Sequence, residues 1–180
     1  MMNEGLIPRR YAKALYKYAQ EQQCTQQVYA DTQRLEEAFA THPALTKALG
    51  NPALSATEKE QLLIAAAGPD AGKAILRFIN LVILNHRETF FRAAMLDYQD
   101  VYRKENNIAR VTIITASAVS DEIVARIKSL LKSKLDKELE FVYEIDPSLI
   151  GGFILRVESM QLDASIQNEL KKLRVKLLNK

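Results

Sequence analysis

The fold of this chain is decided within residues 98–117, which read YQDVYRKENNIARVTIITAS. Before this stretch, apolar residues recur every three or four positions, which is the period of one helix face. From Ile108 onward, β-branched residues alternate with their neighbours, which is the period of a strand. The change of period predicts two domains, covering residues 1–105 and 106–180.

The first domain is predicted to be a bundle of six helices. Ser55-Ala56-Thr57-Glu58 has the pattern of a capping box, which opens a helix. Gly50-Asn51-Pro52 and Gly68-Pro69 are clusters that break helices. Short breaks between helices imply antiparallel neighbours and a compact bundle. The six helices are expected at about 8–23, about 25–41, a short segment after Pro43, a segment from Ser55 to Gly68, 70–85, and about 87–105.

The second domain is predicted to have the order β-α-β-β-α. Its strands are expected at 108–117, at 139–145 and through 153–157, and its helices at about 120–135 and about 164–178. In the last helix, four apolar residues follow a helical spacing: Ile166, Leu170, Leu173 and Leu177. The whole chain is thus expected to be mostly α, with a small α/β domain at its end. A domain of about 75 residues is small for independent folding and is expected to lean on the bundle or on a partner.

Composition restricts the possible function classes. The chain has 180 residues and a net charge of +3. The two predicted domains carry 13 Lys/Arg against 12 Asp/Glu and 12 against 10, so neither has the concentrated basic footprint of a nucleic-acid binder. The N-terminus lacks the apolar core of a signal peptide, and the most apolar run, residues 74–84, is far shorter than the ~20 residues that cross a bilayer. These features predict a soluble protein.

The sequence offers no set of residues for catalysis, for a cofactor or for a metal. His42 and His86 are its two histidines, and both fall at helix ends. The loop from Gly68 to Lys73 has three residues between its glycines where a phosphate-binding loop has four, and Ala74 lacks the hydroxyl that would hold Mg²⁺. The single cysteine, Cys24, has no nearby histidine in the sequence to activate it. We therefore expect a non-catalytic protein that holds partners.

Two surfaces remain open to more than one interpretation. The basic residues of the last helix can contact an acidic partner, which supports an alternative function as a nucleic-acid-binding adaptor, or can form a solvated face. In the first helix, alanines beside Tyr11 and Tyr18 can form a groove for an amphipathic helix. Periodicity alone favours an ordinary core for the same residues.

Three motifs resemble the delta subunit of bacterial F-type ATP synthase, the family that includes the mitochondrial oligomycin-sensitivity-conferring protein. The first is RYAKAL at residues 10–15, and the second is FINLVILNHR at residues 78–87. The third and most specific is LEFVYEIDPSLIGGFILRVESMQLDASI at residues 139–166, where two alternating segments flank Asp146 and the Gly151-Gly152 pair. The three motifs occur in the order that the family has, and the resemblance covers essentially the whole chain.

The resemblance implies a stator subunit of the peripheral stalk that carries no chemistry of its own. In that family the helical bundle grips the N-terminal helix of an alpha subunit in a groove between the first and fifth helices, and the second domain meets the b subunits. One copy per complex, no nucleic acid and a peripheral place on the cytoplasmic face of the inner membrane are also implied. Carried onto this sequence, the expected contacts are Tyr11, Ala14, Leu15, Tyr18, Phe78, Ile79 and Val82.

Overall fold

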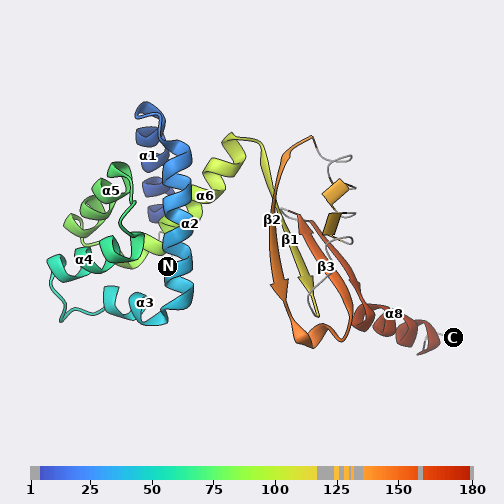
Figure 1. Ribbon diagram of the computed structural model, residues 1–180. Helices are drawn as coiled ribbons and strands as arrows, with labels where there is room; N and C mark the ends of the chain where they lie inside the picture. The colour runs from blue at the N-terminus through green and yellow to red at the C-terminus, as the bar shows by residue number, and fades with distance from the viewer. Residues whose placement is uncertain are drawn as a thin grey trace. The chain divides into compact units, whose positions relative to one another are not determined.

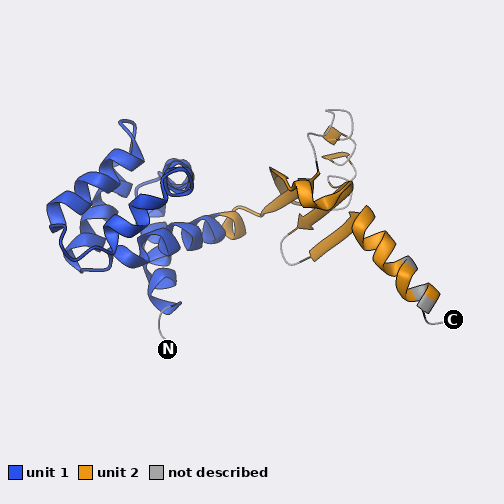
Figure 2. Cartoon of the chain, turned by 90° about the horizontal axis from the view of Figure 1, so that it is seen from below, with its two compact units in different colours: residues 1–102 blue, residues 103–180 orange. Residues whose placement is uncertain are grey.

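The computed structural model separates into two compact units, residues 1–102 and residues 103–180 (Figures 1 and 2). This boundary lies within three residues of the predicted change at 105. The structure describes residues 5–116, 124–125, 128–129, 131, 136–157 and 160–178. The chain is mostly helical and ends in a small unit built on a four-stranded sheet, so the predicted fold class is confirmed.

The first unit contains the six predicted helices. A single turn of 3-10 helix, η1 (Glu88–Phe90), precedes the last of them. The helices are α1 (Leu6–Glu21), α2 (Thr25–Thr41), α3 (Pro43–Leu49), α4 (Ala56–Ala67), α5 (Lys73–Leu84) and α6 (Phe91–Glu105).

Local sequence signals explain where several of these helices begin. The predicted capping box of α4 is present, since Glu58 N donates to Ser55 Oγ at 3.3 Å and Ser55 N donates to Glu58 Oε2 at 2.8 Å. The hydrogen bonds from Ser55 lower the pKa of Glu58. The predicted start of α5 at residue 70 is wrong. Gly72 N donates to the buried carboxylate of Asp31 at 3.0 Å, which holds the preceding residues outside the helix.

The core of the bundle is aromatic. Phe91 is fully buried and its ring lies 6.0 Å from that of Phe78 and 6.3 Å from that of Phe39. Tyr98 is also buried, which raises the pKa of its hydroxyl, and this hydroxyl donates to the carbonyl of Thr25 at 3.0 Å. Such aromatic clusters contribute both apolar burial and specific ring geometry.

The second unit is built on one sheet with the strand order β2-β1-β3-β4. Strand β1 (Ile108–Thr115) lies parallel to β2 (Glu138–Ile145) and antiparallel to β3 (Gly152–Val157), which pairs with β4 (Met160–Ser165). One face of the sheet carries a small buried cluster of Ala109, Val111, Ile113 and Val157, with Leu131, Leu139, Phe141 and Leu155 packed against it.

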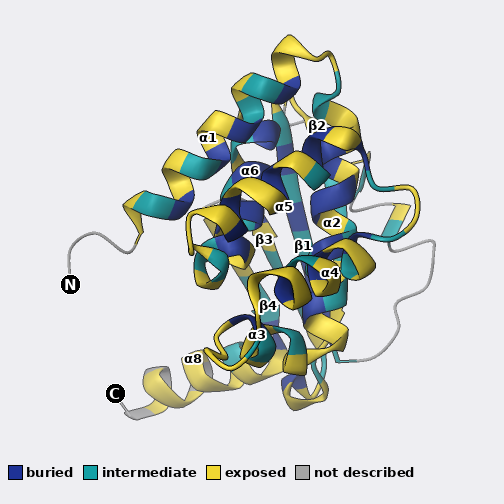
Figure 3. Cartoon of the chain, turned by 90° about the vertical axis from the view of Figure 1, so that its left-hand side faces the viewer, coloured by how far each residue is buried: buried dark blue, intermediate teal, exposed yellow. Residues whose placement is uncertain are grey.

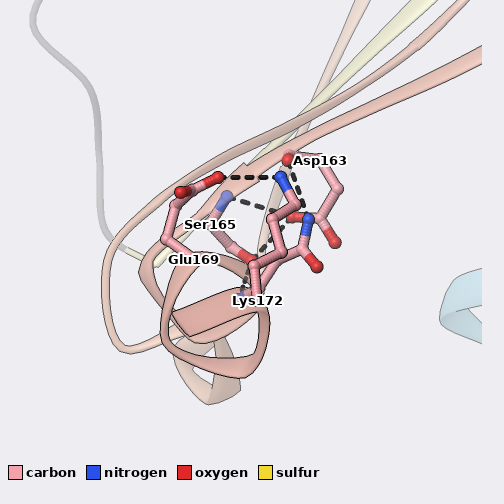
Figure 4. Close-up of polar contacts among 5 residues, drawn as sticks. Asp163, Ser165, Glu169 and Lys172 are labelled. Carbon is pink, nitrogen blue, oxygen red and sulfur yellow. Dashed lines mark hydrogen bonds and ion pairs between the residues drawn. The ribbon is translucent and has the colours of Figure 1, made fainter. Parts of the chain in front are cut away.

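The last helix begins later than predicted, because a fourth strand precedes it. The sequence predicted a helix from about 164, whereas residues 160–165 pair with β3 and α8 spans Ile166–Leu178. Ser165 ends the strand and opens the helix, since its Oγ accepts from Asn168 N at 3.2 Å (Figure 4). Asp163 Oδ1 accepts from both the backbone N and the hydroxyl of Ser165, and these hydrogen bonds lower the pKa of Asp163.

The predicted helix at 120–135 lies largely outside the described residues. Those that are described there, 124–125, 128–129 and 131, are helical. Lys128 Nζ lies 5.2 Å from the centroid of the Phe141 ring, and Leu131 packs against the sheet cluster. The described residues thus belong to the face of the sheet that carries the core.

The glycine pair has a structural cause, as the sequence suggested. Gly152 has φ +79, and a side chain there would overlap the carbonyl of Ala164 in the neighbouring strand. A Cβ at Gly151 would lie 2.7 Å from Ile166 Cδ1 at the start of α8. Both glycines therefore let β3 and β4 approach each other and the helix closely.

No described helix combines the length and the apolar character that crossing a membrane requires.

Candidate partner-binding groove

Helices α1 and α5 contact each other along one side of the bundle. The ring of Tyr11 meets that of Phe78 edge to face, with centroids 6.0 Å apart and planes at 81°. Further along, Arg77 Nη1 donates to the hydroxyl of Tyr18 at 2.5 Å. The end of α1 therefore lies beside the beginning of α5, and the two helices line a shared surface.

The seven predicted groove residues divide into two groups. Four of them belong to the bundle core: Leu15, Phe78, Ile79 and Val82 are between 0% and 4% exposed. Tyr11 and Tyr18 are half-buried, and Ala14 is exposed. The outer surface between the helices is thus formed by the two tyrosines and the alanine, while the four buried residues support it from below.

The structure adds residues of α5 that the sequence analysis did not single out. Arg77 is exposed, and Leu81 and Leu84 are 46% and 70% exposed. Their spacing of four and three positions places them on one flank of the helix, beside its buried face. A signal for them existed in the sequence, because α5 carries leucines outside the apolar stripe that forms its buried face.

One end of this surface is hollowed. The hollow has a volume of about 600 Å³ and shares Tyr18 and Arg77 with the surface between α1 and α5. Its other lining residues are Gln22, Cys24, Gln27, Val28, Ala71, Gly72, Lys73 and Ala74. None of the lining residues is a histidine or a carboxylate, so the lining offers Cys24 no base to activate it.

The loop that closes the hollow is anchored to α2. The fully buried carboxylate of Asp31 accepts from Gly72 N of the loop and, within α2, from the guanidinium of Arg34. Arg34 also donates to the carbonyl of Asp70 at 3.4 Å. The side chains that line the hollow from this loop and from α5 are therefore held in place.

The second unit has an uncovered apolar surface of a different kind. On α8, Ile166, Leu170, Val175 and Leu177 are between 48% and 76% exposed, and Figure 3 shows most of this helix as exposed. Edge strand β4 adds Met160 and Leu162, the opposite edge strand β2 adds Ile145, and the turn before β3 adds Ile150; these four side chains are between 58% and 72% exposed. We call these eight residues the C-terminal apolar surface. Exposed apolar side chains on this scale are a feature of surfaces that bind proteins.

Ile150 shows that this surface is held in a defined shape. Its backbone has φ +54, a region that β-branched residues rarely adopt, and its side chain is 72% exposed. The preceding turn is fixed by Asp146, whose Oδ1 accepts from Ser148 N at 3.0 Å. This hydrogen bonding lowers the pKa of Asp146. Backbone strain of this kind accumulates at functional sites.

The basic residues of α8 lie beside these apolar ones. Lys171, Lys172 and Arg174 are exposed, and Lys172 Nζ pairs with Glu169 Oε1 at 2.8 Å (Figure 4). Among the described residues, no group of three or more His, Cys, Asp or Glu side chains could hold a metal ion.

Comparison with known proteins gives matches over nearly the whole chain. The family model described as ATP synthase delta (OSCP) subunit matches residues 7–177. The ATP synthase subunit delta of Parabacteroides distasonis is 39% identical over 177 residues, which cover 98% of each chain. The subunit of the same name from Phocaeicola vulgatus is 38% identical and is covered over 96% of its length.

A solved structure has the same fold. A chain in the cryo-EM structure of the Toxoplasma gondii mitochondrial ATP synthase hexamer superposes with a TM-score of 0.73 at 21% sequence identity, and 99% of this chain and 98% of that one are covered. The names of these relatives give no support to the alternative of a nucleic-acid-binding adaptor.

Proposed function

This chain belongs to the ATP synthase delta (OSCP) subunit family, a peripheral stalk component of F-type ATP synthase, and from that premise we propose that it is a non-catalytic link between two partners. The first unit binds the N-terminal helix of an alpha subunit of the catalytic head. The second unit binds the b subunits of the stalk at the cytoplasmic face of the inner membrane. The link keeps the head from turning with the rotor.

One observation carries this proposal: each unit has its own uncovered apolar surface beside a packed core. In the first unit, Ala14, Leu81 and Leu84 are exposed between two helices whose buried faces are already filled. In the second, the C-terminal apolar surface has four exposed residues on the sheet strands and their turns and four on α8. A stator link needs two such surfaces, because torque has to pass from one partner to the other through this chain.

The groove between α1 and α5 suits an amphipathic helix. An apolar helix face binds in a shallow groove through residues spaced three, four and seven positions apart. Here Ala14 gives room between Tyr11 and Tyr18, and Leu81 offers apolar contact on the opposite side. The four buried residues beneath position these side chains and do not themselves contact the partner.

The test is a titration of the full chain with a synthetic peptide of the first 25 or so residues of the alpha subunit from the same organism. Isothermal calorimetry should show binding to the unmodified chain. Ala14→Phe fills the groove from an exposed position, and we expect it to weaken binding at least tenfold because hot-spot contacts lie at the centre of an interface. Ala93→Phe is the matched control, since Ala93 is exposed on α6.

The outcomes separate the parts of this proposal. Absence of heat with the unmodified chain would contradict binding of the alpha subunit. Equal binding of the peptide by Ala14→Phe and Ala93→Phe would contradict the groove as the binding site. It would not contradict the alpha subunit as the partner. Binding to the b subunits is tested separately, by co-purification of the chain with them after Leu170→Ser and Leu177→Ser, which should release the stalk and retain the alpha peptide.

A further inference from the structure

The two helices that line the groove are far more basic than the rest of the chain. Residues 6–21 and 73–84 contain six Lys/Arg and one acidic residue, Glu21, which gives 6 − 1 = +5. The whole chain has a net charge of +3, so all other residues together sum to −2. The positive charge of this protein is therefore carried mainly by α1 and α5, and two of these cations, Lys73 and Arg77, line the hollow at the end of the groove.

The exposed cations of these helices stand next to one another. Lys73 and Arg77 are four residues apart on α5, and Lys13 and Lys17 have the same spacing on α1. Like charges at this spacing destabilise a helix. An opposite charge from a partner would relieve this repulsion.

The hollow at the end of the groove presents donors. The hydroxyl of Tyr18 accepts a hydrogen bond from Arg77, which leaves its own proton free to be donated. Lys73 lines the same hollow. Among the described residues, neither Lys73 nor Arg77 forms an ion pair with a carboxylate. An ammonium, a guanidinium and a phenol hydroxyl therefore border a space of about 600 Å³ that has no acidic lining residue.

We infer that the helix bound in this groove is acidic, and that one of its carboxylates occupies the hollow between Lys73, Arg77 and Tyr18. The inference rests on the proposed function and specifies the chemistry of the partner. The apolar face of the bound helix lies against Ala14 and Leu81, and the carboxylate at one end determines its position along the groove. Charged rims of interfaces contribute register and association rate more than bulk affinity.

The test uses the full chain and the same alpha-subunit peptide. Lys73→Glu combined with Arg77→Glu reverses both charges, and we expect binding to weaken by about tenfold at low salt through slower association. The matched control is Lys47→Glu with Lys104→Glu, which makes the same change of net charge at exposed positions of α3 and α6. It should change the affinity less than threefold or so, because neither residue lines the hollow.

A second arm changes the peptide. Replacing its Asp and Glu by Asn and Gln should weaken binding to the unmodified chain by about tenfold. The same replacement should have little further effect on binding to the Lys73→Glu, Arg77→Glu variant, because in a double-mutant cycle the two changes remove the same interaction. The affinity of the unmodified pair should also fall as salt rises.

The outcomes are distinguishable. If the unmodified chain does not bind the peptide at all, the proposed function fails. If it binds with an affinity that neither salt, charge reversal nor amide substitution changes, the groove is apolar only and this inference is overturned. An unchanged thermal unfolding midpoint of the reversed variant excludes misfolding as the cause of a loss.

Discussion

The two units of this chain differ in how far each completes its own core. In the first, the largest aromatic and aliphatic side chains are buried by neighbouring helices, with Phe91, Leu35 and Ile79 fully enclosed. In the second, one small cluster is buried on the sheet, while the C-terminal apolar surface stays in contact with solvent. Nine of the fourteen exposed large apolar side chains of the described residues lie in this smaller unit.

The difference predicts which unit depends more on a partner for its stability. A bundle of about 100 residues can bury enough apolar surface to be stable alone, whereas a unit of under 80 residues is marginal. The small size of the second domain predicts that it is stabilised by the bundle or by a partner. On α8, Ile166, Leu170 and Leu177 share one helix face and are exposed, which suits binding by a partner.

The largest expected loss of stability comes from a substitution in the closed core of the first unit. Phe91→Ala should lower the free energy of unfolding of the bundle by about 3–5 kcal/mol, because it leaves a cavity between two other phenylalanine rings. Hydrogen exchange read separately in each unit should show loss of protection in residues 5–102 only. Leu84→Ala, at a position that is 70% exposed, is the control and should change stability by less than about 0.5 kcal/mol.

The next prediction concerns the sheet of the second unit. Gly152→Ala should destabilise this unit by about 2–3 kcal/mol, because the position has φ +79 and a Cβ would meet the backbone of β4. The matched control is Gly50→Ala, where φ is −80 and the nearest atom would be 3.7 Å away. A shift of the thermal midpoint by both variants alike would contradict this account of the glycine.

A smaller effect is expected from the ion pair of the bundle. Lys59 Nζ and Glu88 Oε1 lie 2.5 Å apart, and both side chains are about nine-tenths buried, at 9% and 12% exposure. Glu88→Gln should cost about 1–2 kcal/mol, since it removes a charge-assisted hydrogen bond and leaves the ammonium without its counter-ion. Denaturant unfolding at pH 7 measures this difference.

The same pair predicts a pH dependence. Burial raises the pKa of Glu88, but the hydrogen bond and charge of Lys59 outweigh it, so the pKa in the folded state lies below the ordinary value of 4.5. A lowered folded pKa gives stability that is present above about pH 4.5 and is lost as the pH falls through the folded value. The bundle should therefore lose stability on acidification below pH 4.5, and Glu88→Gln should reduce that loss.

The smallest expected change of stability is the most informative about the difference between the two units. Leu170→Ser lies on the C-terminal apolar surface, at a position that is 57% exposed, and should change the stability of the isolated chain by less than about 0.5 kcal/mol. A core leucine such as Leu63, which is fully buried in the bundle, should cost several times more when changed to Ser. A large loss from Leu170→Ser in thermal unfolding would show that the second unit already uses this surface internally.

Much of the bundle could be predicted from local signals. The capping box at Ser55, the breaker cluster after Leu49 and the proline at the start of α3 all act through neighbouring residues, so they are visible in the sequence. The start of α5 could not be found in this way, because it depends on Asp31, a residue 41 positions away. Strand β4 was missed for a similar reason, although Met160, Leu162 and Ala164 alternate. Its pairing depends on the free edge of β3.

The sequence by itself determined the helices of the bundle, the change of period near residue 105 and the motifs that identify the family. Tertiary structure alone decided which apolar side chains are enclosed and which face solvent. Leu15 and Phe78 became core, while Ala14 and Leu81, on the same two helices, stayed outside. The physical reason is that the helical period specifies an apolar stripe, whereas the elements that pack against a helix determine which part of that stripe is buried.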